Sequence, residues 1–476
     1  MSGKYQAYPE YRNSGIEWLG DVPSDWSIHA LKRAVYGCVN GIWGGEPDGE
    51  NDLIVLRVAD FDRVKLKVSD KNLTFRSVLN KERKNRLLKK GDLLIEKSGG
   101  GDKTLVGCVV KFDKEYLAVT SNFVAKMTPR EGFDSSFLTY SFAHLYAGRV
   151  NYPSIKQTTG IQNLDSDAYL MERFVFPSLA EQRTIAAFLD HETARIDRLI
   201  EKQQRLIELL KEKRQAVISH AVTKGLDPNV PMKDSGVEWL GQVPEHWGVC
   251  ALSGVTTKIT NGYVGPTRDI FVESGVAYLQ SLHIKNNRID FHTPYFVTEE
   301  WSRSKAKSIL KLGDVLIVQT GDIGQVACVD EKFVGANCHA LIIASPVDRL
   351  HGQFLSQVLN SHYGYHALKS IQTGALHPHL NCNYVKTIKI PFPPKIEQDQ
   401  ILRFICEGTH KYDSLINKSI KAMQLLRERR TALISAAVTG KIDVRNWQPD
   451  SRTQTAEPDL PMAAEQAAEY RVQESP

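Results

Sequence analysis

Features of membrane-spanning, secreted and metal-binding proteins are largely missing from this chain of 476 residues. Its seven cysteines form no Cys-x-x-Cys pair, and an odd number in a chain of this size argues against a disulfide framework. No apolar run approaches the ~18 residues that a membrane helix needs, and residues 1–26 are polar, without the hydrophobic core of a signal peptide. We therefore expect a cytoplasmic protein.

Motifs of catalysis and cofactor binding are missing as well. Residues 97–104 form a glycine-rich loop, but they lack the G-x-x-x-x-G-K-[ST] spacing of a phosphate-binding loop, and the counterpart at 319–325 lacks the Lys-Thr pair. No Asn-Pro-Pro-aromatic motif and no G-x-G-x-x-G motif occurs. His377 and His379, near Cys382, have no equivalent in the first half and indicate a polar contact rather than a zinc site. We expect no catalytic, cofactor-binding or metal-binding site in this chain.

The charge balance is close to neutral, with a formal net charge of +5 and a pI near 8.6. This balance permits a nucleic-acid partner without requiring one. The 42% hydrophobic and 24% charged residues are ordinary values for a globular protein. From Gln448 onward, six acidic residues stand against two arginines and no apolar periodicity remains, so we expect residues 441–476 to form a disordered acidic tail.

What the chain does contain is a long internal repeat. Residues 14–23, SGIEWLGDVP, return at 235–244 as SGVEWLGQVP, and residues 199–223 match residues 415–439. The units of solenoid proteins run ~20–50 residues, so a shift of more than 200 residues indicates a duplicated domain instead. Between the matched segments the two halves diverge. We therefore expect one repeated frame that carries two different contents.

Each half is expected to contain the same parts in the same order. A clamp segment with two tryptophans, Trp18 and Trp26 or Trp239 and Trp247, precedes a region of short β-rich runs and helices, which closes on a Pro-marked strand. Strands are expected at 53–58, 92–96, 105–110, 314–318 and 341–344, and helices at 137–147 and 353–368. The expected divisions are a clamp at 1–26, an α/β domain at 27–177, a helix at 178–222, a linker and second clamp at 223–247, a second α/β domain at 248–393, a helix at 394–440 and the tail at 441–476.

Two long helices are expected because no proline occurs at 181–219 or 397–435. A heptad pattern predicts an antiparallel coiled coil and a pseudo-two-fold arrangement of the mixed α/β domains. About 38 residues would make a spacer of roughly 57 Å. Two unrelated amphipathic helices are the alternative. The predicted seam contains Leu189, Ile196, Gln203, Leu210 and Val217 with Leu199 and Leu206, and Ile405, Tyr412, Ser419, Leu426 and Leu433 with Leu415 and Ala422.

Four repeated features occur together in this chain: the clamp sequence, the Gly-Asp-x-Leu-Ile segments at 91–95 and 313–317, the strand that runs into Glu-Gln, and the Leu-Leu-x-Glu-[Lys/Arg]-Arg helix. In this combination the chain resembles the specificity subunit of type I restriction-modification systems. The resemblance covers about residues 8–443. It implies two target-recognition domains that each read half of a split double-stranded DNA site. It also implies helices that set the spacing and dock two adenine methyltransferase subunits, with motor-nuclease subunits joining them. S-adenosylmethionine would then bind the methyltransferase partner, and ATP and Mg²⁺ the motor-nuclease partner.

Candidate DNA contacts lie in three pairs of polar, glycine-rich loops and two basic runs at matching places in the halves. Asn and Gln suit adenine and Arg suits guanine, so we expect Gln157, Gln162, Asn163 and Arg268 to read bases, and the basic runs to contact phosphates. Ordinary surface turns are the alternative for each residue. The candidates are Asn40, Trp43, Lys81, Arg83, Lys84, Arg86, Lys97, Lys103, Lys156, Gln157, Gln162, Asn163, Asn261, Tyr263, Arg268, Arg303, Lys305, Lys307, Gln319, Gln325, His377 and His379.

Two other functions fit the same sequence. The chain could be a coiled-coil scaffold whose two modules bind proteins instead of DNA. It could also be a nuclease or methyltransferase of an unrecognised kind.

Overall fold

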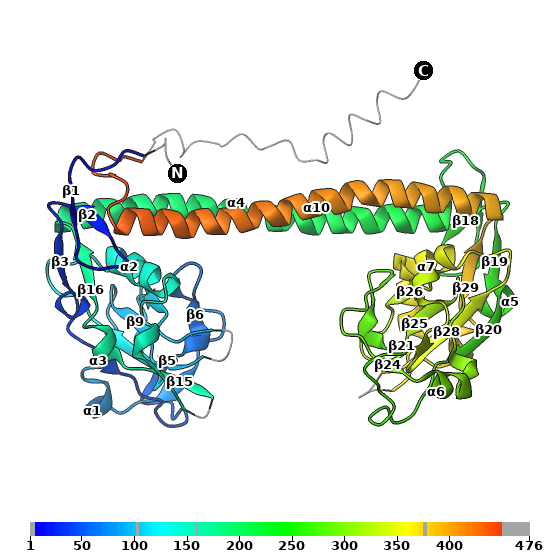
Figure 1. Cartoon of the computed structure of the whole chain (residues 1–476), viewed down its shortest axis with the longest axis horizontal. Helices are drawn as coiled ribbons and strands as arrows, with labels where there is room; N and C mark the ends of the chain where they lie inside the picture. The colour runs from blue at the N-terminus through cyan, green and yellow to red at the C-terminus, as the bar shows by residue number, and fades with distance from the viewer. Residues whose placement is uncertain (1–4, 101–103, 159, 375–377, 450–476) are drawn as a thin grey trace, which may run out of the picture. The chain divides into compact units, whose positions relative to one another are not determined.

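The computed structural model describes residues 5–100, 104–158, 160–374 and 378–449 (Figure 1). The chain forms two compact units: the first ends at Glu201 and resumes at Met423, and the second runs from Lys202 to Ala422. Both units contain helices and sheets, so the predicted mixed α/β class is confirmed. No helix in the described ranges combines the length and apolar character that crossing a bilayer requires.

Two long helices contribute to both units. Helix α4 spans Leu179–Lys224 and helix α10 spans Lys395–Val438, which are 46 and 44 residues (Figure 1). Each is longer than the stretch of about 38 residues used to estimate the spacer, because it begins within two residues of the preceding proline and continues almost to a left-handed glycine. These glycines, Gly225 at φ +77° and Gly440 at φ +71°, end the helices in the conformation that glycine adopts most readily.

The first unit contains a six-stranded sheet and a three-stranded sheet that share a hydrophobic core. The larger sheet has the order β4 (Val39–Asn40), β13 (Val124–Met127), β9 (Leu93–Glu96), β11 (Val109–Lys111), β7 (Lys67–Val68) and β6 (Phe61–Asp62). The smaller sheet has the order β12 (Ala118–Thr120), β5 (Asp52–Leu56) and β8 (Phe75–Ser77). The remaining elements are β1 (Tyr11–Asn13), β2 (Asp21–Pro23), β3 (Ser27–Ala30), β10 (Ser98–Gly99), β14 (Ile155–Thr158), β15 (Ile161–Leu164), β16 (Arg173–Phe176), α1 (Asn80–Arg83), α2 (Ser135–Ala147) and α3 (Ser166–Tyr169).

The second unit repeats much of this topology with fewer strands. Its larger sheet has the order β20 (Thr256–Asn261), β28 (Leu341–Pro346), β25 (Val315–Val318) and β26 (Val326–Cys328), and its smaller sheet the order β24 (Phe296–Val297), β21 (Val276–Leu279) and β27 (Asn337–Cys338). In both units the smaller sheet contains one parallel pair, β5 with β12 and β21 with β27. The remaining elements are β17 (Met232–Asp234), β18 (Gln242–Pro244), β19 (Gly248–Ala251), β22 (Ile284–Lys285), β23 (Arg288–Ile289), β29 (Lys389–Phe392), α5 (Leu252–Val255), α6 (Glu299–Ser304), α7 (Gly352–Asn360), α8 (His362–Ser370) and α9 (Cys382–Val385).

Two predicted elements differ from the structure. The strand expected at 105–110 is β11, which starts only at Val109, because Gly107 at φ +103° interrupts the extended run. The helix expected at 353–368 is two helices, α7 and α8, separated by Ser361 in an extended conformation. The Ser361 Oγ accepts a hydrogen bond from the Gly364 amide at 3.2 Å and so caps α8, which is why the chain starts a second helix there.

The clamp segments fix each α/β domain to a helix end. Trp26 and Trp247 are fully buried, and each donates its indole N–H to the glutamate of the Glu-Gln pair: Trp26 to Glu181 at 3.1 Å and Trp247 to Glu397 at 2.9 Å. The helix-ending glycines complete the contact. A Cβ on Gly440 would lie 2.4 Å from Pro23, and one on Gly225 would lie 3.3 Å from Trp247.

The glutamine of each Glu-Gln pair binds the backbone around it in the same way. The Gln182 Oε1 accepts from the Asp134 amide at 2.9 Å, and its Nε2 donates to the Pro177 carbonyl at 3.0 Å. The Gln398 Oε1 accepts from the His351 amide at 2.8 Å, and its Nε2 donates to the Pro393 carbonyl at 2.9 Å. Both side chains are buried. The repeated Glu-Gln sequence therefore joins the helix start to its domain.

The Gly-Asp segments are a second repeated joint, inside each domain. Asp92 and Asp314 are buried, and each accepts from the backbone amide three residues earlier, of Lys89 at 2.7 Å and of Lys311 at 2.8 Å. Their second oxygens accept a hydroxyl at 2.6 Å, from Thr128 and from Ser345 respectively. Since a buried carboxylate is costly unless hydrogen-bonded, these partners explain why the aspartate recurs.

The buried faces of α4 and α10 differ by one residue from the predicted seam. Ile416 and Met423 are 9% and 7% exposed, whereas Leu415 is 39% exposed, and Ile207 is buried where Leu206 is only half-buried. The buried residues nearest the second predicted line therefore lie one position later along each helix. The heptad pattern of apolar residues did not predict this later line because the line contains polar residues. Its members are Thr193, Ile200, Ile207, Arg214 and Ala221 on α4, and Thr409, Ile416, Met423, Arg430 and Ala437 on α10.

The other line of the seam agrees better with the structure. Leu189, Ile196, Leu210, Ile405 and Leu433 are buried. The remaining large apolar members of this line, Val217, Tyr412 and Leu426, are half-buried.

The predicted disordered tail begins too early. Ile442 and Val444 are buried in the first unit, the Asp443 amide donates to the Gln6 carbonyl at 2.8 Å, and the Trp447 ring packs edge-on against Phe188 at 5.6 Å. The apolar residues in 441–449 therefore pack against a helix. The prediction missed this packing because it relied on the acidic composition of the segment. Residues 450–476 lie outside the described residues.

Candidate nucleic-acid interface

The three candidate loops of the first domain are joined in series, through Asn40 with Lys97 and through Ser98 with Asn163. The Lys97 Nζ donates to the Asn40 Oδ1 at 2.8 Å, and the Arg86 Nε donates to the Asn40 carbonyl at 3.0 Å. Lys97 directly precedes β10, and β10 pairs with β15, where Ser98 lies opposite Asn163. The Ser98 Oγ also donates to the Asn163 Oδ1 at 2.6 Å. Loops more than 50 residues apart in sequence thus form one surface.

Glycine allows the first loop of each domain to lie against a neighbouring strand. A Cβ on Gly41 would lie 2.1 Å from the Thr120 carbonyl oxygen, and one on Gly262 would lie 2.6 Å from the Cys338 carbonyl oxygen. The next residue donates its amide to that same oxygen, Ile42 at 2.7 Å and Tyr263 at 2.9 Å. The loop position is therefore set by backbone contacts, which leaves its side chains free to differ between the domains.

Several candidates in the first domain point toward solvent. Lys156, although exposed, is held at 2.9 Å from Asp165, and this ion pair lowers the pKa of Asp165. Trp43 is 37% exposed. Lys103 lies outside the described residues. The exposed polar and basic candidates are Asn40, Lys81, Lys84, Lys156, Gln157 and Asn163.

Three candidates in this domain have structural partners that the sequence did not reveal. Gln162, predicted to read a base, is only 5% exposed, and its Oε1 accepts from the Val106 amide at 3.1 Å. It alternates with Asn163 along β15, so its side chain points to the opposite, buried face. Arg83 is half-buried and donates to the Val78 carbonyl at 3.0 Å, and the half-buried Arg86 donates to the Glu82 carbonyl at 2.7 Å. Gln162 is thus buried in the domain, unlike its exposed neighbour Asn163.

The loops of the second domain also converge, through different contacts. The Leu380 amide donates to the Gln319 carbonyl at 3.0 Å, and His379 forms β-bridges with both Thr320 and Thr373. The Cys382 Sγ donates to the Asn261 Oδ1 at 2.9 Å, which joins the third loop to the first. His377 lies outside the described residues.

His379 and Cys382 make polar contacts with other described residues. The His379 ring nitrogen Nε2 lies 3.2 Å from the Thr373 Oγ1, as a polar contact. Within the described ranges, no three His, Cys, Asp or Glu side chains are placed to hold a metal ion.

Two of the remaining candidates of the second domain, Tyr263 and Lys305, belong to an aromatic cluster. The Tyr263 ring packs edge-on against Trp301 at 5.0 Å, and the Lys305 Nζ lies 5.6 Å from the Tyr263 ring centroid. Arg303 is exposed but paired with Glu299 at 2.5 Å. The half-buried Gln325 accepts from the Asn286 amide at 3.1 Å. Three others remain: Arg268 and Lys307, which are exposed, and Gln319, which is half-buried.

Sequence reasoning missed two residues that the structure places on these surfaces. Ser98 binds Asn163, and the Arg76 guanidinium stacks on the Trp43 ring at 4.7 Å. Arg76 stands outside the basic run that starts at Lys81, so charge clustering gave no signal for it. Only its strand position, opposite the first loop, brings it to Trp43.

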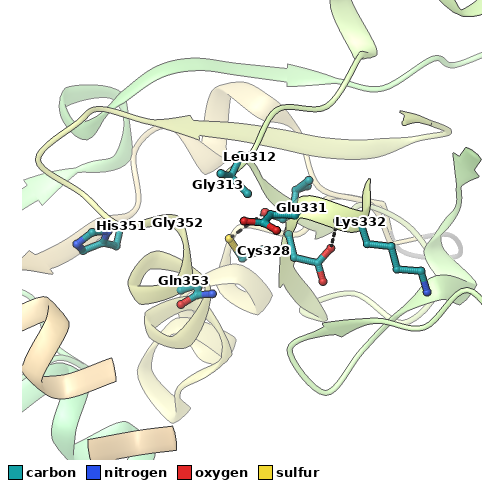
Figure 2. A pocket seen from close by; sticks show the side chains of 10 residues that line it. Leu312, Gly313, Cys328, Glu331, Lys332, His351, Gly352 and Gln353 are labelled. Carbon is teal, nitrogen blue, oxygen red and sulfur yellow. Dashed lines mark hydrogen bonds between the residues drawn. The ribbon is translucent and has the colours of Figure 1, made fainter. Parts of the chain in front are cut away.

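A surface hollow of about 680 Å³ in the second unit lies among other residues (Figure 2). It is lined by Leu312 and Gly313, by residues 328–332 and by residues 351–353. Figure 2 shows Cys328 below Leu312 and Gly313, between His351 and Lys332. Burial raises the pKa of Cys328 to about 12, so its thiol is protonated at neutral pH and is a poor nucleophile. None of the DNA candidates lines this hollow.

Comparisons with known proteins show which proteins this chain is similar to. The model of the type I restriction modification DNA specificity domain matches residues 244–422. The MjaVIII specificity subunit of Methanocaldococcus jannaschii is 25% identical over 295 residues, which cover 60% of this chain and 66% of the relative. The putative MjaX specificity subunit of the same organism is 22% identical over 437 residues, 90% of this chain and 96% of the relative.

A solved structure supports the fold. A chain from work on the complex assembly and conformational transition of the type I R-M system has a TM-score of 0.65 and 14% identity, and the match covers 88% of this chain and 98% of that one. The fold thus defines a protein of two α/β domains, each with three candidate loops. The resemblance to specificity subunits of type I restriction-modification systems is confirmed.

Proposed function

We propose that this chain is the non-catalytic DNA-recognition subunit of a type I restriction-modification complex, and that each α/β domain reads one half of a split DNA site. The observation that carries the proposal is the convergence of three divergent loops in each domain, the first of which has an equivalent backbone position in both domains. A repeated frame with different side chains suits two half-sites of different sequence. Exposed lysines beside these loops supply phosphate contacts.

The two helices are proposed to form an antiparallel coiled coil with pseudo-two-fold symmetry, which fixes the distance between the half-sites. Two ion pairs support this. Arg430 pairs with Asp197 in the first unit and Arg214 pairs with Asp413 in the second, each at 3.0 Å. Each residue of one pair lies 216 positions from its counterpart in the other, which is the repeat shift of the helices.

The helices and clamps are further proposed to dock two adenine methyltransferase subunits, which motor-nuclease subunits then join. S-adenosylmethionine would bind the methyltransferase, and ATP and Mg²⁺ the motor-nuclease. We propose that the domain divisions follow the frame, with recognition domains at 27–177 and 248–393. The repeated sequence then marks what partners contact, and the divergent sequence marks what DNA contacts.

The test is to map methylated adenines in a host that expresses this subunit with its partner subunits. A split site is expected. Replacing residues 27–174 with those of a different specificity subunit should change only one half of that site, whereas lengthening residues 223–234 should change the gap. Absence of sequence-specific methylation, or a domain replacement that alters both halves, would contradict the proposal and favour a protein-binding scaffold.

A further inference from the structure

Arg76 and Glu46 form an ion pair on the face of Trp43, in the first candidate loop. The Arg76 guanidinium lies 4.7 Å from the Trp43 ring centroid, and its Nη1 contacts the Glu46 carboxylate. The exposed fraction is 18% for the Arg76 side chain and 85% for the Glu46 side chain. The arginine is therefore held in place, while its carboxylate partner faces solvent.

Backbone contacts fix this pair. Gly45 and Ser77 bind each other, with amide-to-carbonyl distances of 2.9 and 3.2 Å, so the first loop lies alongside β8. Gly44 makes the approach possible, since it has φ +74° and a Cβ there would lie 2.5 Å from the Ser77 carbonyl. Arg76 precedes Ser77 on β8, and Trp43 precedes Gly44 in the loop. Their stacking thus follows from the backbone.

The pair adjoins the polar surface described above. Asn40, which binds Lys97 and Arg86, lies three residues before Trp43 in the same loop. The exposed Lys81 and Lys84 follow β8 directly. DNA that contacts these groups would pass the Arg76–Glu46 pair.

The chemistry of the pair matches one kind of base pair. A guanidinium donates two parallel hydrogen bonds to the O6 and N7 of guanine, and a carboxylate accepts from the N4 amino group of cytosine in the major groove. An aromatic ring under the guanidinium restricts the orientation of its plane. A phosphate would be a poor ligand here, because the Glu46 carboxylate would repel it.

We propose that Arg76 and Glu46 together read one G·C base pair of the half-site that the first domain recognises, and that Trp43 is the positioning residue for Arg76. This inference rests on the proposed function. In the second domain, Lys305 over Tyr263 occupies a similar place beside the first loop, but lysine lacks the planar pair of donors. The two domains would therefore differ in base preference at this point.

The experiment compares the methylation map and DNA affinity of the complete complex with wild-type chain and with Arg76→Gln, Arg76→Lys, Glu46→Gln and Trp43→Leu. We expect Arg76→Gln to lower discrimination at one G·C position of one half-site about ten- to a hundredfold. Arg76→Lys should lose most of the same discrimination although the charge remains. Glu46→Gln should weaken discrimination at that position alone. Trp43→Leu should reduce discrimination there without changing the other positions.

A matched control is the ion pair of Lys114 with Asp70 in the same domain, whose side chains are 22% and 48% exposed. Lys114→Gln should leave the map unchanged. The second half-site reports on folding within each measurement, since a misfolded first domain would abolish methylation, whereas altered reading keeps the second half-site intact.

Two results would overturn the inference. One is an unchanged map with Arg76→Gln in a complex whose wild-type chain methylates a split site. The other is a uniform loss of affinity at all sequences, with a smaller salt dependence, which would make Arg76 a phosphate contact. Absence of split-site methylation by the wild-type complex would instead contradict the proposed function itself.

Discussion

The joints between domain and helix are nearly the same in the two units, whereas the loops that converge in each domain are built differently. Trp26 with Glu181 and Trp247 with Glu397 make equivalent indole-carboxylate hydrogen bonds, 3.1 and 2.9 Å long. The converging loops form the sheet β10-β15-β14 in the first domain, whereas the described loop residues of the second domain form isolated bridges through His379.

This difference shows that the residue types of the joints are constrained more strongly than those of the loops. A joint must satisfy buried polar groups in one geometry, so its residue types recur. A loop needs only a fixed backbone position, which Gly41 and Gly262 give, and its exposed side chains can then vary. The repeated residues thus hold the backbone in place, and the exposed side chains of the candidate loops can differ between the domains.

Removing the buried tryptophans tests whether the joints are equivalent, and it should have the largest effect. Trp26→Ala and Trp247→Ala each remove a fully buried ring and its hydrogen bond to a glutamate, so each should lower the free energy of unfolding by about 3–5 kcal/mol. Hydrogen exchange resolved by segment should show loss of protection mainly in the unit that carries the substitution.

Trp18→Ala and Trp239→Ala are the controls, since these rings are 41% and 56% exposed. They should cost far less than the buried pair. A similar loss of protection in both units from Trp26→Ala alone would show that the joints are not independent.

The two interhelical ion pairs should differ in strength although their sequence positions are equivalent. Arg430 and Asp197 are 11% and 15% exposed and form a hydrogen bond, whereas Arg214 and Asp413 are 26% and 39% exposed. Arg430→Met leaves a largely buried carboxylate without its partner and should destabilise the first unit by roughly 2 kcal/mol. Arg214→Met should cost less than about 1 kcal/mol, because solvent screens the more exposed pair.

Denaturant unfolding of each variant measures this difference. Arg205→Met is the control, since its pair with Glu208 on α4 is exposed on both sides and should contribute little. Equal losses from Arg430→Met and Arg214→Met would contradict the role of burial.

The frame could be predicted from sequence because it is repeated, and the repeat revealed the clamps, the long helices and the mixed α/β domains. The second predicted line lies one position away from the buried residues. The line on which those buried residues lie contains Arg214 and Arg430, and a search for apolar periodicity leaves out charged residues that pair with a second helix. The order of strands could not be predicted either, since the pairing of β5 with β12 joins segments more than 60 residues apart.

The candidate surface was predicted at the level of loops but not of side chains. Polar composition and glycine spacing located the loops that are joined through Asn40 and Ser98. Composition did not predict that the Gln162 side chain on β15 is buried. It also did not single out Arg76, which lies near Trp43 because Gly45 and Ser77 form a β-bridge. Alternation along a strand and pairing between strands decide these roles.

The smallest expected effect concerns pH at the first joint. Burial raises the pKa of Glu181, while hydrogen bonds from Tyr8 and Trp26 lower it in part. A carboxyl whose pKa is higher in the folded chain binds more protons there than in the unfolded chain, so the stability of the first unit should fall as pH rises above the ordinary value of 4.5. Glu181→Gln keeps an acceptor for Tyr8 and Trp26 but cannot ionise, and it should flatten this dependence. Melting temperatures between pH 4.5 and 8 measure the slope, with the exposed Glu208→Gln as control. An unchanged slope in Glu181→Gln would mean that the buried carboxylate is fully compensated by its two hydrogen bonds.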